Sequence, residues 1–406
     1  WLENCAYLVF FMQCGFAFLE AGNVRYKNVL ITLFKNCIDV CCGTLCWWLV
    51  GYAFAFGDDR GRFIGASFFA GDKINTYDKY NLWNFNWALA AASTTIVSGC
   101  VVERMHIWGY VLLSSFINAW TYPVVVHWAW HEEGWLKHMG FHDFGGCAVV
   151  HMVGGVTGFA ATVMLGARNG RFLKKDQKVP PHYDDEFKPT NLPFVVLGTL
   201  ILWFCWYGFN CGSVITMIGN EVLVGKSAMN TTLGAATGGL VSFIIHYITH
   251  KNTNNKYSLA VLCNGILAGC VGITGAADVV ASWAAVTIGV IAVLIYFFYI
   301  WFLKYIKVDD PLDAVAIHFG VASWGCVAVG WFHESKGILY GGGGKQFGVN
   351  LLGVVVSFAW TFFFTCMFNL LLKLLGLFRI SITAARPAGA THSAPGRYRK
   401  PQFNHT

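Results

Sequence analysis

The stretch DFGGCAVVH, from Asp143 to His151, places a histidine within apolar sequence, eight positions after an aspartate. A second stretch, DPLDAVAIH from Asp310 to His318, has the same spacing in the other half of the chain. Ionisable side chains inside membrane segments are costly, so they generally mark a pathway for ions, protons or substrate. The repeated spacing predicts two equivalent helices that meet at one site between internal repeats.

The composition identifies a membrane protein. Hydrophobic residues make up 56% of the 406 residues, charged residues only 12%, and the mean hydropathy is +0.52. Soluble domains average about 25% charged residues. Many apolar runs approach the roughly 20 residues that a helix needs to cross a bilayer. Because these runs are continuously apolar and do not alternate, they predict helices and not barrel strands. The 45 glycines are typical of closely packed membrane helices.

The apolar runs predict an all-α integral membrane protein with eleven transmembrane helices. The predicted spans are 2–22, 28–56, 83–102, 107–129, 143–166, 192–217, 228–250, 258–276, 280–303, 312–332 and 347–375. A basic linker, 168–191, separates the first five helices from the next five, which predicts a five-plus-five inverted repeat with an extra C-terminal helix. We expect one membrane domain over 1–376 and a disordered cytoplasmic tail over 377–406.

The positive charges predict the orientation. Nineteen Lys and Arg residues fall in one set of loops and eight in the other. Because positive residues stay on the cytoplasmic side, the N-terminus is expected outside and the C-terminus inside. This asymmetry accounts for the net charge of +7, so nucleic-acid binding is not expected.

His151 and His318 are the clearest candidates for a chemical role, because their spacing from an aspartate is repeated. A neutral imidazole has one donor and one acceptor nitrogen, so two facing rings in an apolar pore could share a proton and relay a polar solute. We expect their ring nitrogens to lie at roughly 2.7–3.2 Å. The alternative is a pair of core histidines bonded to backbone carbonyls. Asp143 and Asp310 are expected to cap their helices, which is by itself a sufficient reason for an aspartate there.

Aromatic residues gather near one end of the predicted helices. They include Trp130 in HWAW, Phe85, Trp87 and the stretch WYGFNCGS over 206–213. An aromatic face attracts a small cation by about 0.5–2 kcal/mol, and the Ser213 hydroxyl adds an acceptor, so the group is suited to ammonium. The alternative is an interfacial aromatic belt.

Metal and cofactor sites are not expected. The loop HWAWHEEGWLKHMGFHD contains four histidines and two glutamates, but their spacing matches no compact ligand set. The acidic charge there equally fits the mouth of a cation pathway. The 14 cysteines lie mostly in predicted helices and are read as packing residues. Axial haem ligation by His151 and His318 would give a coloured protein and is a minor alternative.

Seven motifs resemble those of the ammonium transporter family, the Amt/Mep/Rh superfamily, and more specifically its Amt branch. They are FFMQCGFAFLEAGNVRYKN (10–28), SGCVVER (98–104), YPVVVHWAW (122–130), DFGGCAVVHMVGG (143–155), WYGFNCGS (206–213), NGILAGCVGITG (264–275) and DDPLDAVAIH (309–318). They occur in the family's order across helices one to ten. The resemblance implies a non-enzymatic homotrimer in the plasma membrane that moves ammonium or ammonia.

The resemblance also implies a role for each site residue. Trp130 and Ser213 correspond to the ammonium recruitment site, with Asp143 supporting it. Phe85 and Phe209 correspond to the aromatic gate. His151 and His318 correspond to the twin histidines of the pore, with Trp206 and Thr274 beside them.

Some positions depart from the family pattern. Leu89 stands where an aromatic residue usually joins the recruitment site, which predicts looser binding. Ala316 and Phe319 replace common glycines, which is expected to narrow that side of the pore. The tail after Arg379 lacks the acidic, glycine-containing segment that couples subunits. An ammonium sensor with low flux and a Rh-like gas channel stay open as alternatives, although Trp130 and Ser213 argue against the second.

Overall fold

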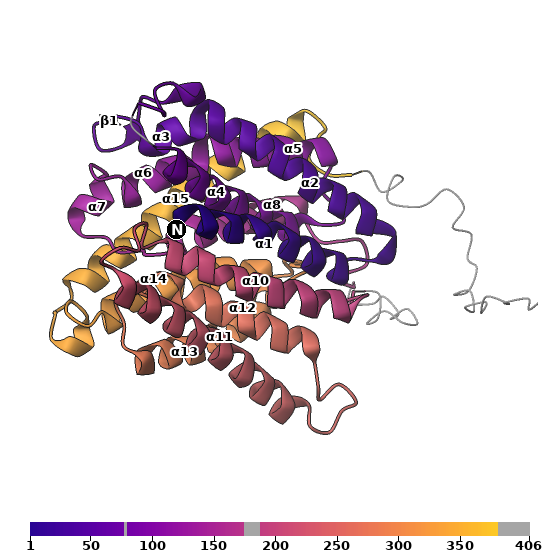
Figure 1. Cartoon of the computed structure of the whole chain (residues 1–406). Helices are drawn as coiled ribbons and strands as arrows, with labels where there is room; N and C mark the ends of the chain where they lie inside the picture. Colours follow the sequence, from indigo (N-terminus) through magenta and orange to yellow (C-terminus); the bar gives the residue numbers. More distant parts are fainter. Residues whose placement is uncertain (77–78, 174–186, 381–406) are drawn as a thin grey trace, which may run out of the picture.

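Eleven helical segments pack side by side in the computed structural model, which describes residues 1–76, 79–173 and 187–380 (Figure 1). The eleven segments are α1 (Leu2–Asn23), α2–η2–α3 (Val29–Cys46, Trp47–Gly51, Tyr52–Phe56), α4 (Tyr80–Val101), α5–η4–α6 (Ile107–Phe116, Ile117–Thr121, Tyr122–Trp130), η5–α8 (Cys147–Met152, Val153–Leu165), α10 (Leu192–Gly212), α11 (Glu221–His250), α12 (Leu259–Thr274), α13 (Ser282–Tyr305), η6–α14 (Ala316–Val321, Ala322–Phe332) and α15 (Lys345–Leu374). Residues 174–186 of the predicted linker and 381–406 of the predicted tail lie outside the described residues.

Short elements connect these segments. They are η1 (Tyr26–Asn28), η3 (Phe69–Gly71), α7 (Trp135–Met139), η7 (Ile338–Tyr340) and an antiparallel pair of strands, β1 (Asp59–Arg60) and β2 (Ile64–Gly65). Most of them lie at the end of the molecule where α6 ends and α10 ends, on the left of Figure 1.

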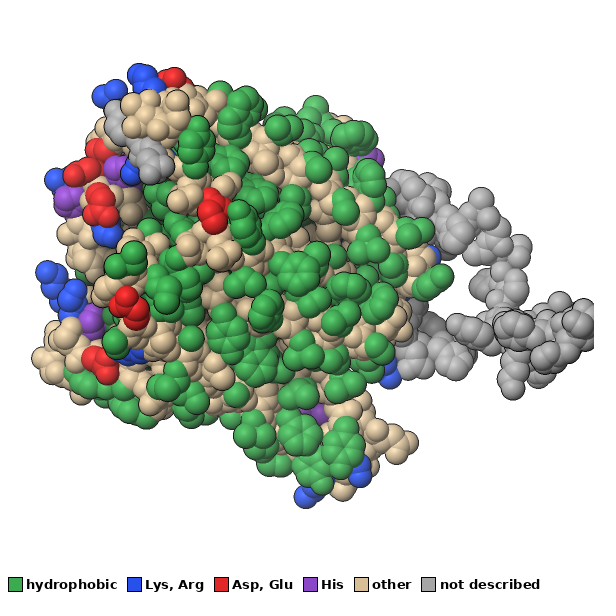
Figure 2. Space-filling model, in the orientation of Figure 1, with side chains coloured by type: hydrophobic (Ala, Val, Ile, Leu, Met, Phe, Trp, Pro, Cys, Tyr) green, Lys and Arg blue, Asp and Glu red, His purple; other side chains and the backbone are tan. Residues whose placement is uncertain are grey.

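The surface of the molecule confirms an all-helical membrane protein. Within the described residues, eight helices are long and apolar enough to cross a bilayer. Large apolar side chains point outward along these helices; Phe298 on α13, for example, is 53% exposed. Figure 2 shows hydrophobic side chains over the middle of the visible face, with many of its charged side chains at one end. Exposed apolar side chains along helices of this length are typical of membrane-spanning segments.

Several helix boundaries differ from the predicted ones. The fifth helix begins at Cys147 and not at residue 143, because Asp143 stays outside the helix and caps it. The tenth begins at Ala316, four residues later than predicted. The sixth helix ends at Gly212 and not at residue 217, since the chain turns there and Ile215 has a left-handed φ of 66°. The seventh begins at Glu221, seven residues earlier than predicted.

Glycines allow the closest helix contacts, as their abundance predicts. A Cβ at Gly238 of α11 would lie 2.2 Å from the carbonyl oxygen of Gly265 on α12. One turn along α12, a Cβ at Gly269 would lie 2.0 Å from the carbonyl oxygen of Gly234. Any side chain at these positions would separate the helices, so glycine sets their distance.

An ion network joins four loops at the end opposite to β1 and β2. Arg168, after α8, donates to Asp309 through its backbone and guanidinium at 2.8–3.1 Å and to Glu103 at 2.9 Å. Arg25 donates to Glu103 at 3.0 Å, and Arg104 donates to the Asp309 carbonyl at 2.6 Å. Burial opposes ionisation of both carboxyls, but the arginines outweigh it and hold their pKa values below the ordinary range. The network therefore connects the loops after α1, α4, α8 and α13.

Replacing Arg168 by Gln is expected to destabilise the protein by about 3–5 kcal/mol at pH 7, because Glu103 and Asp309 would remain as buried charges without their main partner. The lowered carboxyl pKa values stabilise the native fold above the unfolded pKa, and this contribution disappears as the pH falls through the folded pKa. The loss in melting temperature should therefore shrink at acid pH. A matched control is Lys226→Gln at the exposed Lys226–Glu334 pair, expected to cost about 0–1 kcal/mol. Equal losses in the two variants would contradict the prediction.

Candidate functional site

Two equivalent helix starts present the two histidines. The carboxylate of Asp143 accepts hydrogen bonds from the backbone N–H groups of the fourth, fifth and sixth following residues at 2.6, 2.8 and 3.0 Å. The carboxylate of Asp310 does the same at 3.1, 2.7 and 3.3 Å. Each cap leads into a π-helical turn that contains the histidine, His151 in η5 and His318 in η6. The predicted caps are confirmed.

The imidazoles meet at hydrogen-bond distance. Nδ1 of His151 lies 3.2 Å from Nδ1 of His318, and the ring centroids are 5.2 Å apart. Both side chains are buried. The helices approach closely here, since a Cβ at Gly155 would lie 2.3 Å from the His318 carbonyl carbon. The predicted contact is confirmed, and the alternative in which each ring bonds only to a backbone carbonyl does not describe this pair.

The contact constrains the protons of the pair. If both rings are neutral, one Nδ1 must donate and the other must accept, so the rings hold their protons on different nitrogens. The Nε2 atom of His151 is buried without a hydrogen-bond partner. Buried polar atoms are normally satisfied, and an exception at a predicted pore suggests a place where a polar solute is bound transiently.

Aromatic rings cover one side of His151. Trp206 and Phe209 of α10 stack on its imidazole, with centroids 5.2 and 5.3 Å away and interplanar angles of 18° and 17°. The Trp206 indole N–H donates to the Thr274 hydroxyl at 2.8 Å. The carbonyl of Thr274 accepts the N–H of Gly145, in the loop that follows Asp143, at 3.0 Å. Trp206 and Thr274 therefore hold each other beside the histidine pair, where the sequence placed them.

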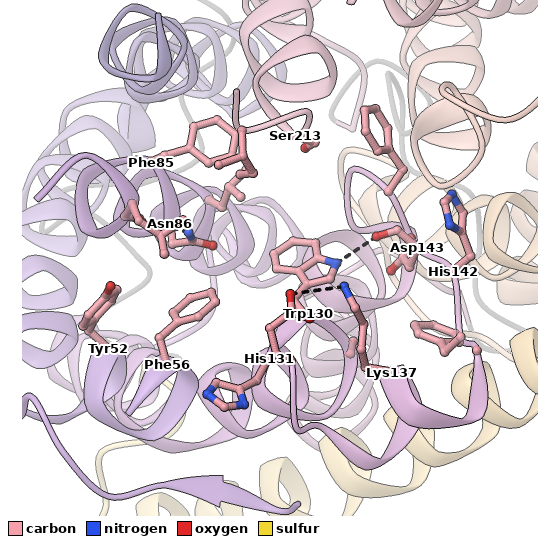
Figure 3. A pocket seen from close by; sticks show the side chains of 18 of the residues that line it. Tyr52, Phe56, Phe85, Asn86, Trp130, His131, Lys137, His142, Asp143 and Ser213 are labelled. Carbon is pink, nitrogen blue, oxygen red and sulfur yellow. Dashed lines mark hydrogen bonds and ion pairs between the residues drawn. The ribbon is translucent and has the colours of Figure 1, made fainter. Parts of the chain in front are cut away.

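A cavity of about 640 Å³, the Trp130 cavity, opens at the end of the molecule that carries β1 and β2 (Figure 3). Five predicted site residues line it, from α4, α6, the Asp143 loop and the end of α10: Phe85, Leu89, Trp130, Asp143 and Ser213. The Trp130 indole N–H donates to the Asp143 carbonyl at 2.8 Å, which fixes the ring. The Ser213 hydroxyl donates to the Phe209 carbonyl at 2.9 Å, so its oxygen is left to accept another hydrogen bond.

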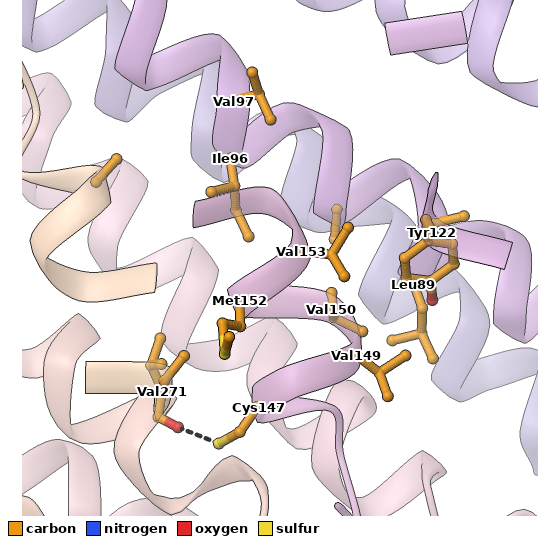
Figure 4. Packing of buried hydrophobic residues seen from close by; sticks show 14 of the residues in the cluster. Leu89, Ile96, Val97, Tyr122, Cys147, Val149, Val150, Met152, Val153 and Val271 are labelled. Carbon is orange, nitrogen blue, oxygen red and sulfur yellow. Dashed lines mark hydrogen bonds between the residues drawn. The ribbon is translucent and has the colours of Figure 1, made fainter. Parts of the chain in front are cut away.

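The two predicted gate residues occupy different depths. Phe85 lines the Trp130 cavity and packs close to α10, since a Cβ at Gly212 would lie 2.6 Å from its ring. Phe209 is fully buried one turn earlier on α10, stacked on His151. Phe85 thus borders the cavity, whereas Phe209 borders the histidine pair. Leu89 is also buried, and Figure 4 draws it in the apolar core with Tyr122, Val149 and Val150.

Three lysines line the Trp130 cavity, Lys79, Lys137 and Lys336, and no sequence motif singled them out. Lys137 forms an exposed ion pair with Glu132 at 3.8 Å. Lys137 lies in the histidine-rich loop, whose histidines and carboxylates have the chemistry of metal ligands. Lys336 belongs to no sequence motif. It follows α14, and only the folding of the chain brings it to the cavity.

The loop histidines have separate partners. His127 contacts the Ala55 carbonyl and Asp59, each at 3.0 Å, His138 contacts Glu133 at 3.1 Å, and His142 contacts Asp278 at 3.0 Å. No group of three or more metal-ligating side chains comes together among the described residues. His127 and His142 therefore tie the loop to neighbouring elements, while the His138 contact lies within the loop.

Ala316 and Phe319, the two residues of the tenth helix that depart from the family pattern, lie in different surroundings. Ala316 is fully buried. The Phe319 ring packs against Phe159, Tyr299 and Phe358, with centroids 5.4–5.7 Å apart. Phe319 thus contacts α8, α13 and α15 and lines none of the cavities described here.

Comparison with known proteins gives the family. The model of the Ammonium Transporter Family matches residues 1–388. Ammonium transporter 3 of Dictyostelium discoideum is 35% identical over 402 residues, which cover 94% of this chain and 89% of that protein. Ammonium transporter 1 member 3 of Solanum lycopersicum is 36% identical over 430 residues, covering 97% and 90%.

The fold agrees with the sequence comparisons. A solved structure of a sensor Amt protein matches with a TM-score of 0.87 at 32% identity, over 95% of each chain. The match includes the helical bundle that holds the histidine pair. A family match across nearly the whole sequence and the shared fold show that this chain belongs to the ammonium transporter family.

Proposed function

We propose that the protein carries ammonium nitrogen across the membrane, by recruiting the cation, deprotonating it and conducting ammonia through an apolar pore. The observation that carries this proposal is the buried contact of 3.2 Å between His151 and His318, beneath two stacked aromatic rings. An isolated ion in such surroundings would pay a large desolvation cost, whereas neutral ammonia would not.

Recruitment is assigned to the Trp130 cavity. The Trp130 face offers a cation–π contact, and Ser213 offers a free acceptor lone pair. Asp143 contributes indirectly, because its carboxylate is occupied by the helix cap and its carbonyl orients Trp130. Leu89 supplies apolar wall where an aromatic residue would have added a third attractive face.

Passage is assigned to the aromatic gate and the histidine pair. Phe85 and Phe209 separate the cavity from His151, so the substrate loses its water at this point. His151 Nε2 and the shared Nδ1 proton give ammonia hydrogen-bonding positions and give a released proton a carrier. Trp206 and Thr274 keep the His151 ring in place from one side.

The architecture we propose for this function is a five-plus-five inverted repeat. The equal pattern of the Asp143 and Asp310 caps supports it, since both carboxylates bond to the fourth, fifth and sixth following residues. Helix α15 then braces the repeat, within a membrane domain over 1–376. We further propose a homotrimer in the plasma membrane, with the Trp130 cavity outside and the 377–406 tail inside.

An ammonium sensor with little flux is the second candidate. The similarity to the sensor Amt protein structure, at a TM-score of 0.87, favours it. The two candidates share the recruitment site but differ in turnover. Uptake by the purified protein in liposomes separates them, because a sensor would bind ammonium without moving it at a comparable rate.

The orientation predicts which loops a membrane-impermeant thiol reagent reaches in intact cells. Glu132→Cys, near the Trp130 cavity, is expected to react, because Glu132 is strongly exposed. Asn252→Cys, in the loop between α11 and α12, is expected to react only after the membrane is permeabilised. Labelling is measured relative to the native chain, which has 14 cysteines of its own. The reverse pattern would overturn the orientation.

Loss of the recruitment contacts should weaken ammonium binding. Trp130→Ala or Ser213→Ala is expected to raise the apparent KM about 2- to 30-fold, corresponding to roughly 0.5–2 kcal/mol. Leu89→Phe should lower KM by restoring an aromatic face. The measurement is concentration-dependent uptake in liposomes. If KM were unchanged in all three variants, the Trp130 cavity would not be the recruitment site.

Replacing His151 tests the pore. His151→Ala should keep the fold and lower transport, because a polar position and a proton carrier are lost. His151→Asp retains a protonatable group but adds an ion, so the ratio of charge movement to ammonia flux should change. We expect potassium to be admitted in this variant only. Current and internal pH are recorded together in liposomes. A variant that only expresses poorly, with native selectivity, would instead indicate a structural histidine.

A further inference from the structure

A buried cluster of ionisable side chains lies outside the pathway described so far, between α1, α2, α4 and α5. Glu20 and Lys35 are 1% and 7% exposed, and Asp39 is 1% exposed. Lys35 Nζ lies 3.4 Å from a carboxylate oxygen of Glu20 and donates to the Ser98 carbonyl at 2.9 Å. Charges at this depth in membrane helices are costly and generally serve a function.

Glu20 borders the histidine pair. A small cavity of about 20 Å³, the His318 cavity, is lined by His318, Glu20, Thr95 and apolar side chains. One water needs roughly 10–15 Å³ and two or more polar partners, so this cavity has room and partners for one. Glu20 also has one carboxylate oxygen that is buried without a hydrogen-bond partner. A single water in this cavity would lie beside both His318 and Glu20.

Lys35 borders a different space. The Lys35 cavity, of about 480 Å³, is lined by Lys35, Thr32, Glu103, His106 and Arg379 among others. It lies where α4 ends and α5 begins, which is the end opposite to the Trp130 cavity. The Tyr110 ring, whose centroid is 5.0 Å from Lys35 Nζ, supports the ammonium form. Glu20 and Lys35 thus touch each other while each touches a separate cavity.

We propose that Glu20 and Lys35 are a proton-transfer pair, which carries the proton released from ammonium from the histidine pair to the Lys35 cavity. Glu20 carboxylate accepts the proton through the water and becomes a carboxylic acid. Lys35 ammonium releases one proton to water in the Lys35 cavity, and the resulting amine takes the proton of Glu20. Both groups return to their starting state, and one proton has moved. Ammonia itself continues through the pore.

Neighbouring polar groups hold the side chains of Glu20 and Lys35 in position. The Ser98 hydroxyl lies 2.7 Å from Glu20 and 2.8 Å from the Asn36 side-chain oxygen, and its one hydrogen can serve only one of them at a time. Asp39 accepts hydrogen bonds from the hydroxyls of Tyr110, Ser114 and Thr95 and itself lines none of the three cavities. Asp39 is therefore a suitable control, since it is a buried carboxylate one turn from Lys35 that borders neither cavity of the route.

This inference rests on the proposed transport function, so the native chain is the first arm of its test. Proteoliposomes receive an ammonium gradient, and the charge moved and the total ammonium accumulated are measured together. If the native chain accumulates no ammonium, the transport proposal fails. If it accumulates ammonium without charge, transport stands and the proton route is overturned.

The decisive variant is the double replacement Glu20→Gln with Lys35→Met, which removes both charges of the ion pair together. We expect the charge moved per ammonium to fall on the order of tenfold or more, while ammonia continues to pass. Asp39→Asn should keep the native ratio. A native ratio in the double variant, or an equal fall of charge and accumulation, would show that the pair only braces the helices. The same loss of ratio in Asp39→Asn would also overturn the assignment.

Discussion

The contact between the imidazoles of His151 and His318 depends on two helices, η5–α8 and η6–α14, whose first turns are buried inside the bundle. A helix start leaves backbone N–H groups without partners, and in a membrane interior these must be satisfied by the protein. Asp143 and Asp310 supply the acceptors, each for three N–H groups. The π-helical turns that follow carry the histidines into contact, with Gly155 allowing the close approach. Without the caps, the pair would have no fixed position.

Asp143 also connects the histidine pair to the Trp130 cavity. Its carboxylate caps η5, while its backbone carbonyl accepts the Trp130 indole N–H. The following loop is bound to the carbonyl of Thr274, whose hydroxyl holds Trp206 against His151. A disturbance at this aspartate would therefore reach both the recruitment site and the pore, because its carboxylate already accepts three backbone hydrogen bonds of the cap.

In a low-dielectric surrounding a buried charge needs partners, and the charged side chains of this protein are placed accordingly. At one end, arginines and carboxylates form a shared network around Arg168, where several partners offset the cost of burial. Deeper in the bundle, Glu20, Lys35 and Asp39 form a second cluster, in which Glu20 borders the His318 cavity and Lys35 borders the Lys35 cavity. This placement is more specific than bracing alone requires, since uncharged side chains could pack the same helices.

The sequence by itself determined the membrane class, the number of helices and the residues of the histidine pair, because apolar length and repeated spacing are local properties. It also determined the caps, since an aspartate one turn before an apolar run has few other roles. Only the tertiary structure decided what lies across from each residue. Lys336 reaches the Trp130 cavity from a distant loop, and Glu20 and Lys35 meet across two helices, although their sequence separation gives no sign of contact. Such pairings depend on how helices pack, and packing is set by side-chain shape over the whole bundle, which no local pattern records.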